Sequence, residues 1–213
     1  MIEVPARGLL FDCDGVLVDS LPSAGVAWNR WAETYAPSFE FFRDMVQGRR
    51  SSEMIATLVA PEIFDEADRR LVEMEIELTV DIPPIPGAET LLPSLPDGGW
   101  AVVTSGGREL ATARLRSAGL PVPPAMITAG DVANGKPNPE PYLKGAALLG
   151  LDPVDCIVFE DATAGVLAAL AAGVGLVVGV GPEIRGTGAH VFIDDLRAVS
   201  CVDGMLRIDA SRR

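Results

Sequence analysis

Short apolar runs alternate with helical stretches over the second half of the chain. Five of these runs are typical of strands, at residues 100–104, 125–129, 156–159, 174–180 and 190–193. The stretches between the first four of them are typical of helices, at 108–118, 140–149 and 163–172. Strands separated by helices at this spacing imply right-handed crossovers. The pattern therefore predicts an α/β fold, a doubly wound parallel sheet.

An earlier strand ends on two aspartates. The apolar run 8–11 leads into Asp12, and Asp14 follows after one residue. Side chains two apart on a strand point the same way, so both carboxylates are expected to converge where the strand ends. Gly15 then lets the backbone turn sharply. Two carboxylates this close need a cation or a proton between them. The alternative interpretation is an ordinary acidic turn.

Residues 20–80 contain no strand-like run and repeat the spacing of amphipathic helices. Four helices are expected, beginning near residues 20, 39, 51 and 65. A stiff, helix-breaking segment follows at 82–87, with the sequence IPPIPG. Because this helical block interrupts the strand pattern, we expect an inserted domain over residues 18–83. The remaining residues, 1–17 and 84–213, would form the sheet-containing domain.

Charge and cysteine content limit the class of protein. The net charge of the 213 residues is -13, which argues against a nucleic-acid backbone or an anionic membrane surface as partner. The three cysteines show no CxxC spacing, which favours a reducing compartment. No basic-then-apolar leader begins the chain, and no apolar run is long enough to span a membrane. We therefore expect a cytoplasmic protein, and the acidic surface favours a monomer.

Chemically active side chains follow several of the expected strands. In an open parallel sheet, functional groups gather at the carboxyl ends of the strands. The residues at those ends, or in the loops that follow, are Asp12, Asp14, Thr104, Ser105, Gly106, Lys136, Glu160 and Asp161. Carboxylates supply hard oxygen ligands for Mg²⁺ and a nucleophile, while a hydroxyl, backbone amides and an ammonium suit phosphoryl oxygens. The set predicts a Mg²⁺ and phosphate site.

Four segments, in the same order along the chain, resemble the motifs of the haloacid dehalogenase superfamily. They are residues 12–17 (DCDGVL), 102–106 (VVTSG), 135–137 (GKP) and 159–161 (FED). The helical insert is similar to the cap of the β-phosphoglucomutase-like branch. Local runs most resemble the sugar-phosphate and polyol-phosphate phosphatases of that branch. The resemblance implies a phosphatase acting on small phosphorylated metabolites, with residues 18–83 as its cap.

The resemblance also implies catalytic roles for four residues. Asp12 would attack phosphorus and become an aspartyl phosphate. Asp14 would protonate the leaving oxygen and then take a proton from the hydrolytic water. Thr104 would donate to a phosphoryl oxygen, and Lys136 would offset charge on Asp12 and on the phosphoryl group.

Metal and substrate contacts are implied in the same way. Mg²⁺ would be held by the Asp12 carboxylate, the Asp14 backbone carbonyl and Asp161. Glu160 would be a further ligand or a supporting group. Substrate would meet Thr104, Ser105, Gly106 and Lys136, and in the cap Arg49 or, more strongly favoured, Arg50.

Two alternatives remain at this point. A hexose-phosphate mutase is one, but mutases of this branch typically carry a histidine early in the first cap helix, where this chain has Ala24. The other is a non-catalytic nucleotide-binding or regulatory module, suggested by glycines at 173, 175, 179 and 181. Neither glycine pair is followed by a third glycine three positions on, so the dinucleotide fingerprint is absent.

Overall fold

A six-stranded parallel sheet forms the centre of the molecule in the computed structural model, which describes residues 1–210. Its order is β4-β3-β2-β5-β6-β7, and every neighbouring pair is parallel. The strands are β2 (Leu9–Phe11), β3 (Trp100–Val103), β4 (Met126–Ile127), β5 (Ile157–Glu160), β6 (Leu176–Val180) and β7 (Val191–Ile193). The predicted doubly wound parallel sheet is confirmed.

Helices cover both faces of this sheet because its strands are apolar on both sides. Leu9 and Phe11 of β2 face one hydrophobic core, while Leu10 faces the other. The first core is closed by α5 (Ala88–Leu91) and α6 (Arg108–Ser117). The second is closed by α7 (Glu140–Leu148) and α8 (Thr163–Ala172). Continuous burial of this kind is what a parallel sheet requires.

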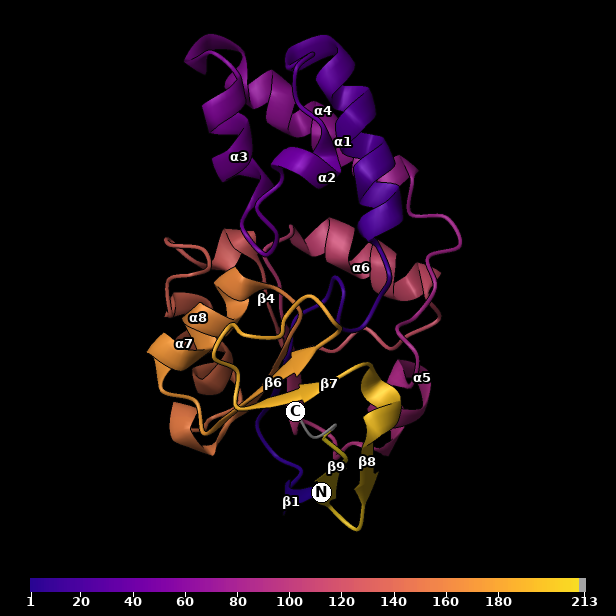
Figure 1. The fold of residues 1–213 in the computed structure, drawn as a ribbon, viewed down its shortest axis with the longest axis vertical. Coiled ribbons are helices and arrows are strands. Elements are labelled where there is room, and N and C mark those ends of the chain that lie inside the picture. Colours follow the sequence, from indigo (N-terminus) through magenta and orange to yellow (C-terminus); the bar gives the residue numbers. More distant parts are fainter. Residues whose placement is uncertain (211–213) are drawn as a thin grey trace.

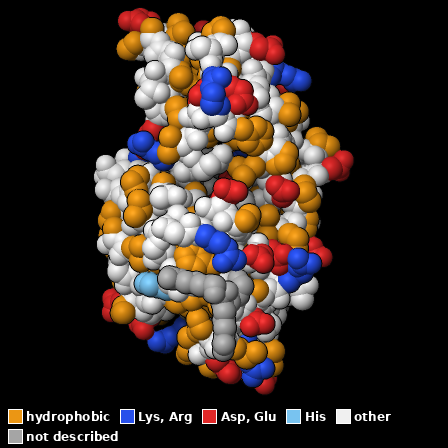
Figure 2. Space-filling view, viewed as in Figure 1, with side chains coloured by type: hydrophobic (Ala, Val, Ile, Leu, Met, Phe, Trp, Pro, Cys, Tyr) orange, Lys and Arg blue, Asp and Glu red, His pale blue; other side chains and the backbone are white. Residues whose placement is uncertain are grey.

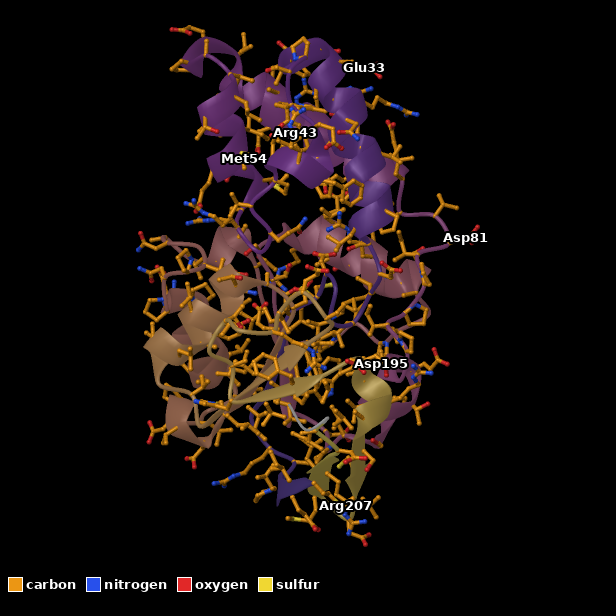
Figure 3. The ribbon with its side chains drawn as sticks, viewed as in Figure 1. Glu33, Arg43, Met54, Asp81, Asp195 and Arg207 are labelled. Atoms are coloured by element: carbon orange, nitrogen blue, oxygen red, sulfur yellow. The ribbon has the colours of Figure 1, made fainter. Side chains whose placement is uncertain are left out.

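Four helices form a separate layer above the sheet, which we call the helical unit (Figure 1). They are α1 (Leu21–Tyr35), α2 (Phe41–Asp44), α3 (Ser51–Leu58) and α4 (Phe64–Glu77). Trp28, Trp31 and Leu71 belong to a third hydrophobic cluster, and the Trp31 Nε1 donates to the Ala67 carbonyl at 2.8 Å. Figure 3 labels Glu33, Arg43 and Met54 within this unit.

The second of these helices is shorter than expected. The sequence pattern predicted a helix from Phe39 to Val46, whereas α2 spans Phe41–Asp44. The Glu40 carboxylate caps its N-terminus by accepting from the amides of Phe42 and Arg43. Met45 is already extended, so the chain leaves the helix after a single turn.

Two crossings connect the helical unit to the sheet, and they run side by side. The Asp19 amide donates to the Pro83 carbonyl, and the Ile85 amide donates to the Leu17 carbonyl, both at 2.9 Å. Val18 and Pro84 form an isolated antiparallel bridge between these two bonds. Asp81, labelled in Figure 3, lies just before the returning crossing.

A second, antiparallel sheet joins the two ends of the chain, and the sequence analysis did not foresee it. Its order is β1 (Ile2–Pro5), β9 (Met205–Ile208) and β8 (Val199–Val202). It lies at the end of the molecule farthest from the helical unit (Figure 1), and Figure 3 labels Arg207 on β9. Leu206 and Ile208 are fully buried in the first core.

Short 3-10 turns complete the described chain. They are η1 (Pro61–Ile63), η2 (Leu92–Ser94), η3 (Ala129–Asp131), η4 (Pro153–Asp155) and η5 (Leu196–Ala198). The turn η3 explains why β4 is shorter than the strand expected at 125–129. Thr128 and Asp131 form a reciprocal capping box, which ends the strand after Ile127.

Charged side chains are mixed on the surface. Figure 2 shows Lys and Arg interspersed with Asp and Glu on the face in view. None of the described helices has both the length and the apolar character needed to cross a lipid bilayer.

Candidate active site

The candidate site begins in the tight loop after β2. Asp12 stays beside the sheet because its amide donates to the Phe159 carbonyl at 3.0 Å. The chain then turns at Gly15, whose φ is +81°. A Cβ at Gly15 would also overlap the Asp161 carboxylate. Glycine is therefore required here both for backbone conformation and for the close approach of Asp161.

Lys136 is buried at the centre of the site, with a side chain only 1% exposed. Its Nζ donates to Asp12 Oδ1 at 2.5 Å, to Glu160 Oε1 at 2.6 Å and to the Val103 carbonyl at 2.9 Å. These three acceptors lie at the carboxyl ends of β2, β5 and β3, which are neighbours in the sheet. All three donor positions of the ammonium are used, so its charge is held in one place.

Glu160 is held by groups of the protein. The Tyr142 hydroxyl donates to Glu160 Oε1 at 2.5 Å, and the Ala162 amide donates to Oε2 at 3.3 Å. A Cβ at Gly165 would overlap this carboxylate. We call Lys136, Asp12, Glu160 and Tyr142 the Lys136 cluster. With Oε1 already shared by Lys136 and Tyr142, the arrangement favours Glu160 as a support for Lys136.

Three carboxylates lie close enough to share a cation. One oxygen each of Asp12, Glu160 and Asp161 falls within 4.8 Å of the others. Among the described residues, the Asp161 side chain has no hydrogen-bond or ion-pair partner, unlike Asp12 and Glu160. A partly buried carboxylate without a partner, next to two more carboxylates, is a group that a divalent cation would stabilise. The residues present therefore fit Mg²⁺.

Burial and charge shift the pKa values in this cluster. Burial raises the pKa of Asp12 to about 7, although Lys136 acts against the rise. Burial also raises the pKa of Asp161 well above its usual range, and the nearby Asp12 and Glu160 add to this effect. For Lys136, burial lowers the pKa, but the attraction of Asp12 and Glu160 outweighs it and the net shift is upward. Lys136 is therefore charged at neutral pH.

Thr104, Ser105 and Gly106 follow β3 at the same edge of the sheet. Thr104 is buried, and its Oγ1 accepts from the Gly106 amide at 3.0 Å. The Ser105 hydroxyl donates to the Gly48 carbonyl at 2.7 Å, which ties this loop to the helical unit. All three residues line the cavity described next.

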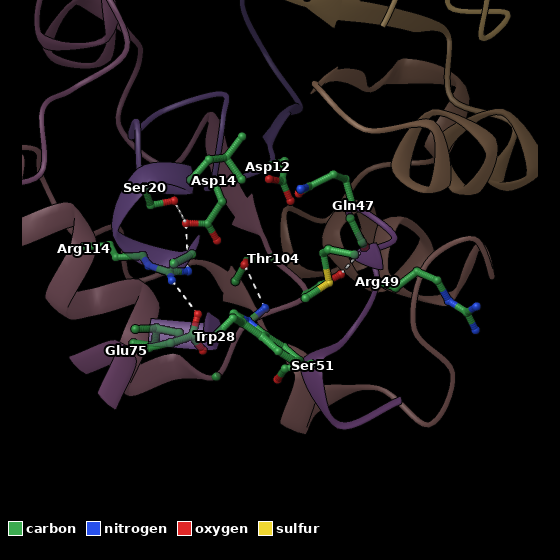
Figure 4. Close-up of a pocket in the computed structure, with 18 of the residues that line it drawn as sticks. Asp12, Asp14, Ser20, Trp28, Gln47, Arg49, Ser51, Glu75, Thr104 and Arg114 are labelled. Atoms are coloured by element: carbon green, nitrogen blue, oxygen red, sulfur yellow. Dashed lines mark hydrogen bonds and ion pairs between the residues drawn. The ribbon is translucent and has the colours of Figure 1, made fainter. Parts of the chain in front are cut away.

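A cavity of about 310 Å³ lies between the helical unit and the sheet (Figure 4). Its sheet side carries Asp12, Asp14, Thr104 and Asp161. Its other side is formed by residues of the helical unit, among them Ala24, Trp28, Phe41, Met45, Gln47, Arg49, Ser51 and Glu75. The volume lies at the lower end of the range of roughly 300–1,000 Å³ for small-molecule pockets, so the cavity suits a small ligand.

Asp14 takes part in a network that the sequence analysis missed. Its Oδ1 accepts from the Ser20 hydroxyl at 2.5 Å and from Arg114 at 2.9 Å, and Arg114 also donates to Glu75 at 2.8 Å (Figure 4). Ser20 directly precedes α1, but its hydroxyl donates to Asp14 and does not cap the helix. We call Arg114, Asp14 and Glu75 the Arg114 bridge.

Glu75 and Arg114, which were not predicted as site residues, lie on otherwise apolar helix faces. Glu75 is four residues after the buried Leu71 on α4, and Arg114 is four residues after the buried Leu110 on α6. Burial raises the pKa of Glu75, although Arg114 acts against the rise. A charge at a core position of an amphipathic helix is the signal that could have found them, because buried charges need partners.

The two candidate arginines of the helical unit both pair with Glu53. Arg49 lines the cavity and is paired with Glu53 at 3.0 Å. Arg50 lies in a second, more open hollow beside the Lys136 loop, where its NH2 donates to the Ala133 carbonyl at 2.8 Å. It also pairs with Glu53 at 3.0 Å. Arg49 also lines this second hollow, and Figure 4 shows its side chain directed away from Asp12 and Thr104.

Comparisons with known proteins support the family resemblance. The model of the family described as haloacid dehalogenase-like hydrolase matches residues 6–173. Hexitol phosphatase A of Escherichia coli K12 is 44% identical over 174 residues, which cover 78% of this chain and 80% of that protein. Glycerol-1-phosphate phosphohydrolase 2 of Saccharomyces cerevisiae is 36% identical over 186 residues, which cover 81% and 74%.

Solved structures show the same fold. A β-phosphoglucomutase from Clostridium difficile superimposes with a TM-score of 0.79 at 23% identity, covering 90% of this chain and 92% of that one. At this level of identity the likeness concerns the fold alone.

Proposed function

The chain belongs to the haloacid dehalogenase-like hydrolases, and we propose that it is a Mg²⁺-dependent phosphatase of small polyol and sugar phosphates. The reaction would proceed through an aspartyl phosphate on Asp12. The observation that carries this proposal is the position of Asp12. It lines a small cavity, Lys136 pairs with one of its oxygens, and Asp161 lies beside it. The named phosphatase relatives support the substrate class.

Asp12 and Asp161 would hold Mg²⁺ together with the backbone carbonyl of Asp14, and Glu160 would position Lys136. When bound, Mg²⁺ supplies positive charge that offsets the charge of the phosphoryl oxygens. It would also compensate the carboxylate repulsion that raises the pKa of Asp12 and Asp161 in addition to the effect of burial. Both side chains would then be ionised, as a nucleophile and a ligand must be.

Asp12 would attack phosphorus in line with the leaving oxygen. Lys136 fixes the Asp12 carboxylate through Oδ1, so the other oxygen can face the substrate. Thr104 and the Ser105 amide would bind the phosphoryl oxygens, and the Gly106 amide, which donates to Thr104 Oγ1, would orient the Thr104 hydroxyl toward them. Asp14, which lines the same cavity, would protonate the leaving oxygen and then activate the water that hydrolyses the aspartyl phosphate.

The cavity supports a small, polar substrate with some apolar contact. Arg49 and Gln47 offer polar groups, and Trp28, Phe41 and Met45 offer apolar surface on the same side. A phosphate at Asp12 would direct its polyol or sugar portion toward the helical unit. We therefore propose that this unit, with boundaries at residues 18–83, acts as a cap that selects the substrate and excludes water.

Mutase activity is disfavoured by the wall of the cavity. Ala24 of α1 lines the cavity at about the position where the branch's mutases carry histidine. A mutase must keep water from its aspartyl phosphate while it transfers the phosphoryl group back to the sugar. We propose that Ala24, having no group for acid-base chemistry, makes hydrolysis the outcome.

A panel of phosphate esters tests the proposed function. We expect Mg²⁺-dependent release of phosphate from glycerol 1-phosphate and hexitol phosphates, and turnover of p-nitrophenyl phosphate as a generic substrate. Hexose 1-phosphates should be incubated in parallel, with and without a hexose bisphosphate activator. Isomerisation without phosphate release would contradict the phosphatase proposal, and so would the absence of phosphate release from every ester.

Cysteine content and net charge bear on the location, oligomeric state and partners of the protein. We propose a cytoplasmic location, which the three cysteines without disulfide bonds support. We also propose that the protein is a monomer that contacts neither nucleic acid nor membrane, in keeping with its net charge of -13.

A further inference from the structure

A guanidinium group is buried between the helical unit and the loop that carries Asp14. Arg114 belongs to α6, its side chain is only 6% exposed, and it pairs with Asp14 at 2.9 Å and Glu75 at 2.8 Å. We propose that Arg114 is a positioning residue for Asp14, and that Glu75 of the helical unit holds Arg114 in place. This inference rests on the proposed phosphatase function, in which Asp14 protonates the leaving oxygen.

The contacts fix one oxygen of Asp14 and leave the other available. Oδ1 accepts from both Ser20 and Arg114. Oδ2 has no hydrogen-bond partner among residues 1–210, and the side chain is 24% exposed on the cavity wall. Two donors on a single oxygen restrict rotation of the carboxyl group. The second oxygen is thereby kept toward the cavity, where a leaving group would lie.

Arg114 depends on both carboxylates for its own position. Its Nε is buried and has no partner among the described residues, so only the two terminal nitrogens anchor the guanidinium. The Glu75 side chain is 6% exposed, and Arg114 is its one ion-pair partner in the part of the chain that the structure describes. If Glu75 loses its charge, Arg114 keeps a single ionic anchor and its hold on Asp14 becomes looser.

The bridge also makes the orientation of Asp14 depend on the helical unit. Glu75 lies on α4, which packs on α6 directly below it (Figure 1). Figure 4 shows Arg114 between Glu75 and Asp14, with Ser20 on the far side of Asp14. Arg114 therefore has both anchors only while α4 rests on α6. Closure of the cavity and orientation of Asp14 are coupled through this one side chain.

The positioned group matters in one bond-breaking step. The bond between phosphorus and the leaving oxygen breaks, the bond between phosphorus and an Asp12 oxygen forms, and the proton of the Asp14 carboxyl moves to the leaving oxygen. A polyol alkoxide is a poor leaving group and needs this proton. p-Nitrophenolate is a stable anion at neutral pH and leaves without it. A residue that acts by orienting Asp14 must therefore affect the two substrates differently.

Two substrates and two Arg114 variants test the proposal. In Arg114→Met and Arg114→Lys, kcat/KM would be measured for glycerol 1-phosphate and for p-nitrophenyl phosphate, since kcat/KM covers only the steps up to departure of the leaving group. We expect Arg114→Met to lower kcat/KM about 100-fold for the polyol ester and less than about 3-fold for the aryl ester. Arg114→Lys, which keeps the charge, should recover part of the difference.

Glu75 is tested in the same way and through a double variant. Glu75→Gln should shift the ratio of the two kcat/KM values in the same direction by about 5–10-fold. In the Arg114→Met background it should have no further effect, because Glu75 acts through Arg114. The double variant also avoids the unpaired, deeply buried Glu75 carboxylate that Arg114→Met alone would leave, while Asp14, whose side chain is 24% exposed, keeps its hydrogen bond from Ser20.

Two neighbouring exposed residues give matched controls. Arg116→Lys on α6 and Glu77→Gln on α4 alter the same residue types outside the cavity and should leave turnover of both substrates unaffected. Equal loss of activity on both substrates in the folded Arg114 variants would overturn the positioning role. So would a further effect of Glu75→Gln in the double variant. Failure of the wild-type protein to hydrolyse either ester would instead contradict the proposed function.

Discussion

Lys136 and Arg114 are both buried cations that pair with two carboxylates, yet they connect different parts of the molecule. The partners of Lys136 lie at the carboxyl ends of two strands of one sheet: Asp12 directly follows β2, and Glu160 is the last residue of β5. The partners of Arg114, Asp14 and Glu75, lie on the loop after β2 and on the helical unit. The Lys136 cluster is thus internal to one rigid sheet edge, whereas the Arg114 bridge requires two bodies to meet.

The comparison separates two tasks that the two aspartates would perform. In the proposed mechanism Asp12, held at the sheet edge by Lys136, would be ready for attack whether or not the helical unit closes the cavity. Asp14 is held by Arg114, which also pairs with Glu75 of the helical unit. The orientation of Asp14 would therefore depend on whether the helical unit closes the cavity. A nucleophile that is always in place and an acid that is in place only on closure would limit bond breaking to the enclosed substrate.

Loss of Lys136 should have the largest effect. We expect Lys136→Met to lower kcat about 1,000-fold for polyol and aryl phosphates alike, because in the proposed mechanism Lys136 offsets charge on both the phosphoryl group and the nucleophile Asp12. The free energy of unfolding should fall by about 3–5 kcal/mol, since two buried carboxylates lose their counter-ion. Steady-state kinetics on both esters and denaturant unfolding measure these effects. We expect Arg114 variants to change the ratio of the kcat/KM values for the two esters. If Lys136→Met changed that ratio as well, Lys136 and Arg114 could not be assigned different roles.

Binding of Mg²⁺ should depend on pH through the carboxylates of Asp12 and Asp161. The pKa of Asp12 is raised to about 7 in the folded state, above the unfolded value of 3.8, and that of Asp161 is also raised. The metal-free folded protein therefore holds extra protons between about pH 4 and pH 7, and its stability falls as the pH rises through this window. Mg²⁺ needs both groups ionised, so it restores more stability at high pH.

Thermal unfolding measures this linkage. The difference in Tm between Mg²⁺ and EDTA should increase from about pH 5.5 to about pH 8. Glu75→Gln, in the Arg114 bridge, should leave that difference in Tm unchanged, because Glu75 is not a proposed metal ligand. A Tm difference independent of pH would show that Asp12 and Asp161 do not bind the metal as proposed.

Tyr142 should have the smallest effect. Tyr142→Phe removes one hydrogen bond to Glu160, which keeps its bonds to Lys136 and the Ala162 amide. We expect a loss of about 1.5 kcal/mol in unfolding free energy and less than about a 10-fold fall in kcat. Unfolding and kinetics of the same preparation check both values. A loss as large as that of Lys136→Met would show that Tyr142, and not Lys136, organises the cluster.

The parallel sheet and the positions of the residues around Lys136 could be predicted from sequence, because short local patterns of residues indicate them. Asp12, Thr104, Lys136 and Asp161 each follow a strand or lie in a short motif, and the topology of a parallel sheet brings such positions to one edge. The resemblance to the haloacid dehalogenase superfamily rested on those motifs, and the family match confirms it. The four helices of the insert were also found from their apolar spacing.

The parts that were missed depend on contacts between distant segments. Glu75 and Arg114 are 39 residues apart, and helical spacing alone does not say which two helices will meet. The pairing of β1 with β9 joins Ile2 to Ile208, a contact that no local pattern encodes.

The most direct test of the account uses Asp14→Asn with p-nitrophenyl phosphate and Mg²⁺. This ester needs no proton to form the aspartyl phosphate, but hydrolysis of that intermediate needs Asp14 to activate water. Stopped-flow absorbance should show a rapid release of about one equivalent of p-nitrophenolate per enzyme, followed by a slow phase. Mass spectrometry after acid quenching should find the phosphoryl group on the peptide that contains Asp12. A slow linear release without a burst, or a phosphoryl group on another residue, would contradict the division of tasks between Asp12 and Asp14.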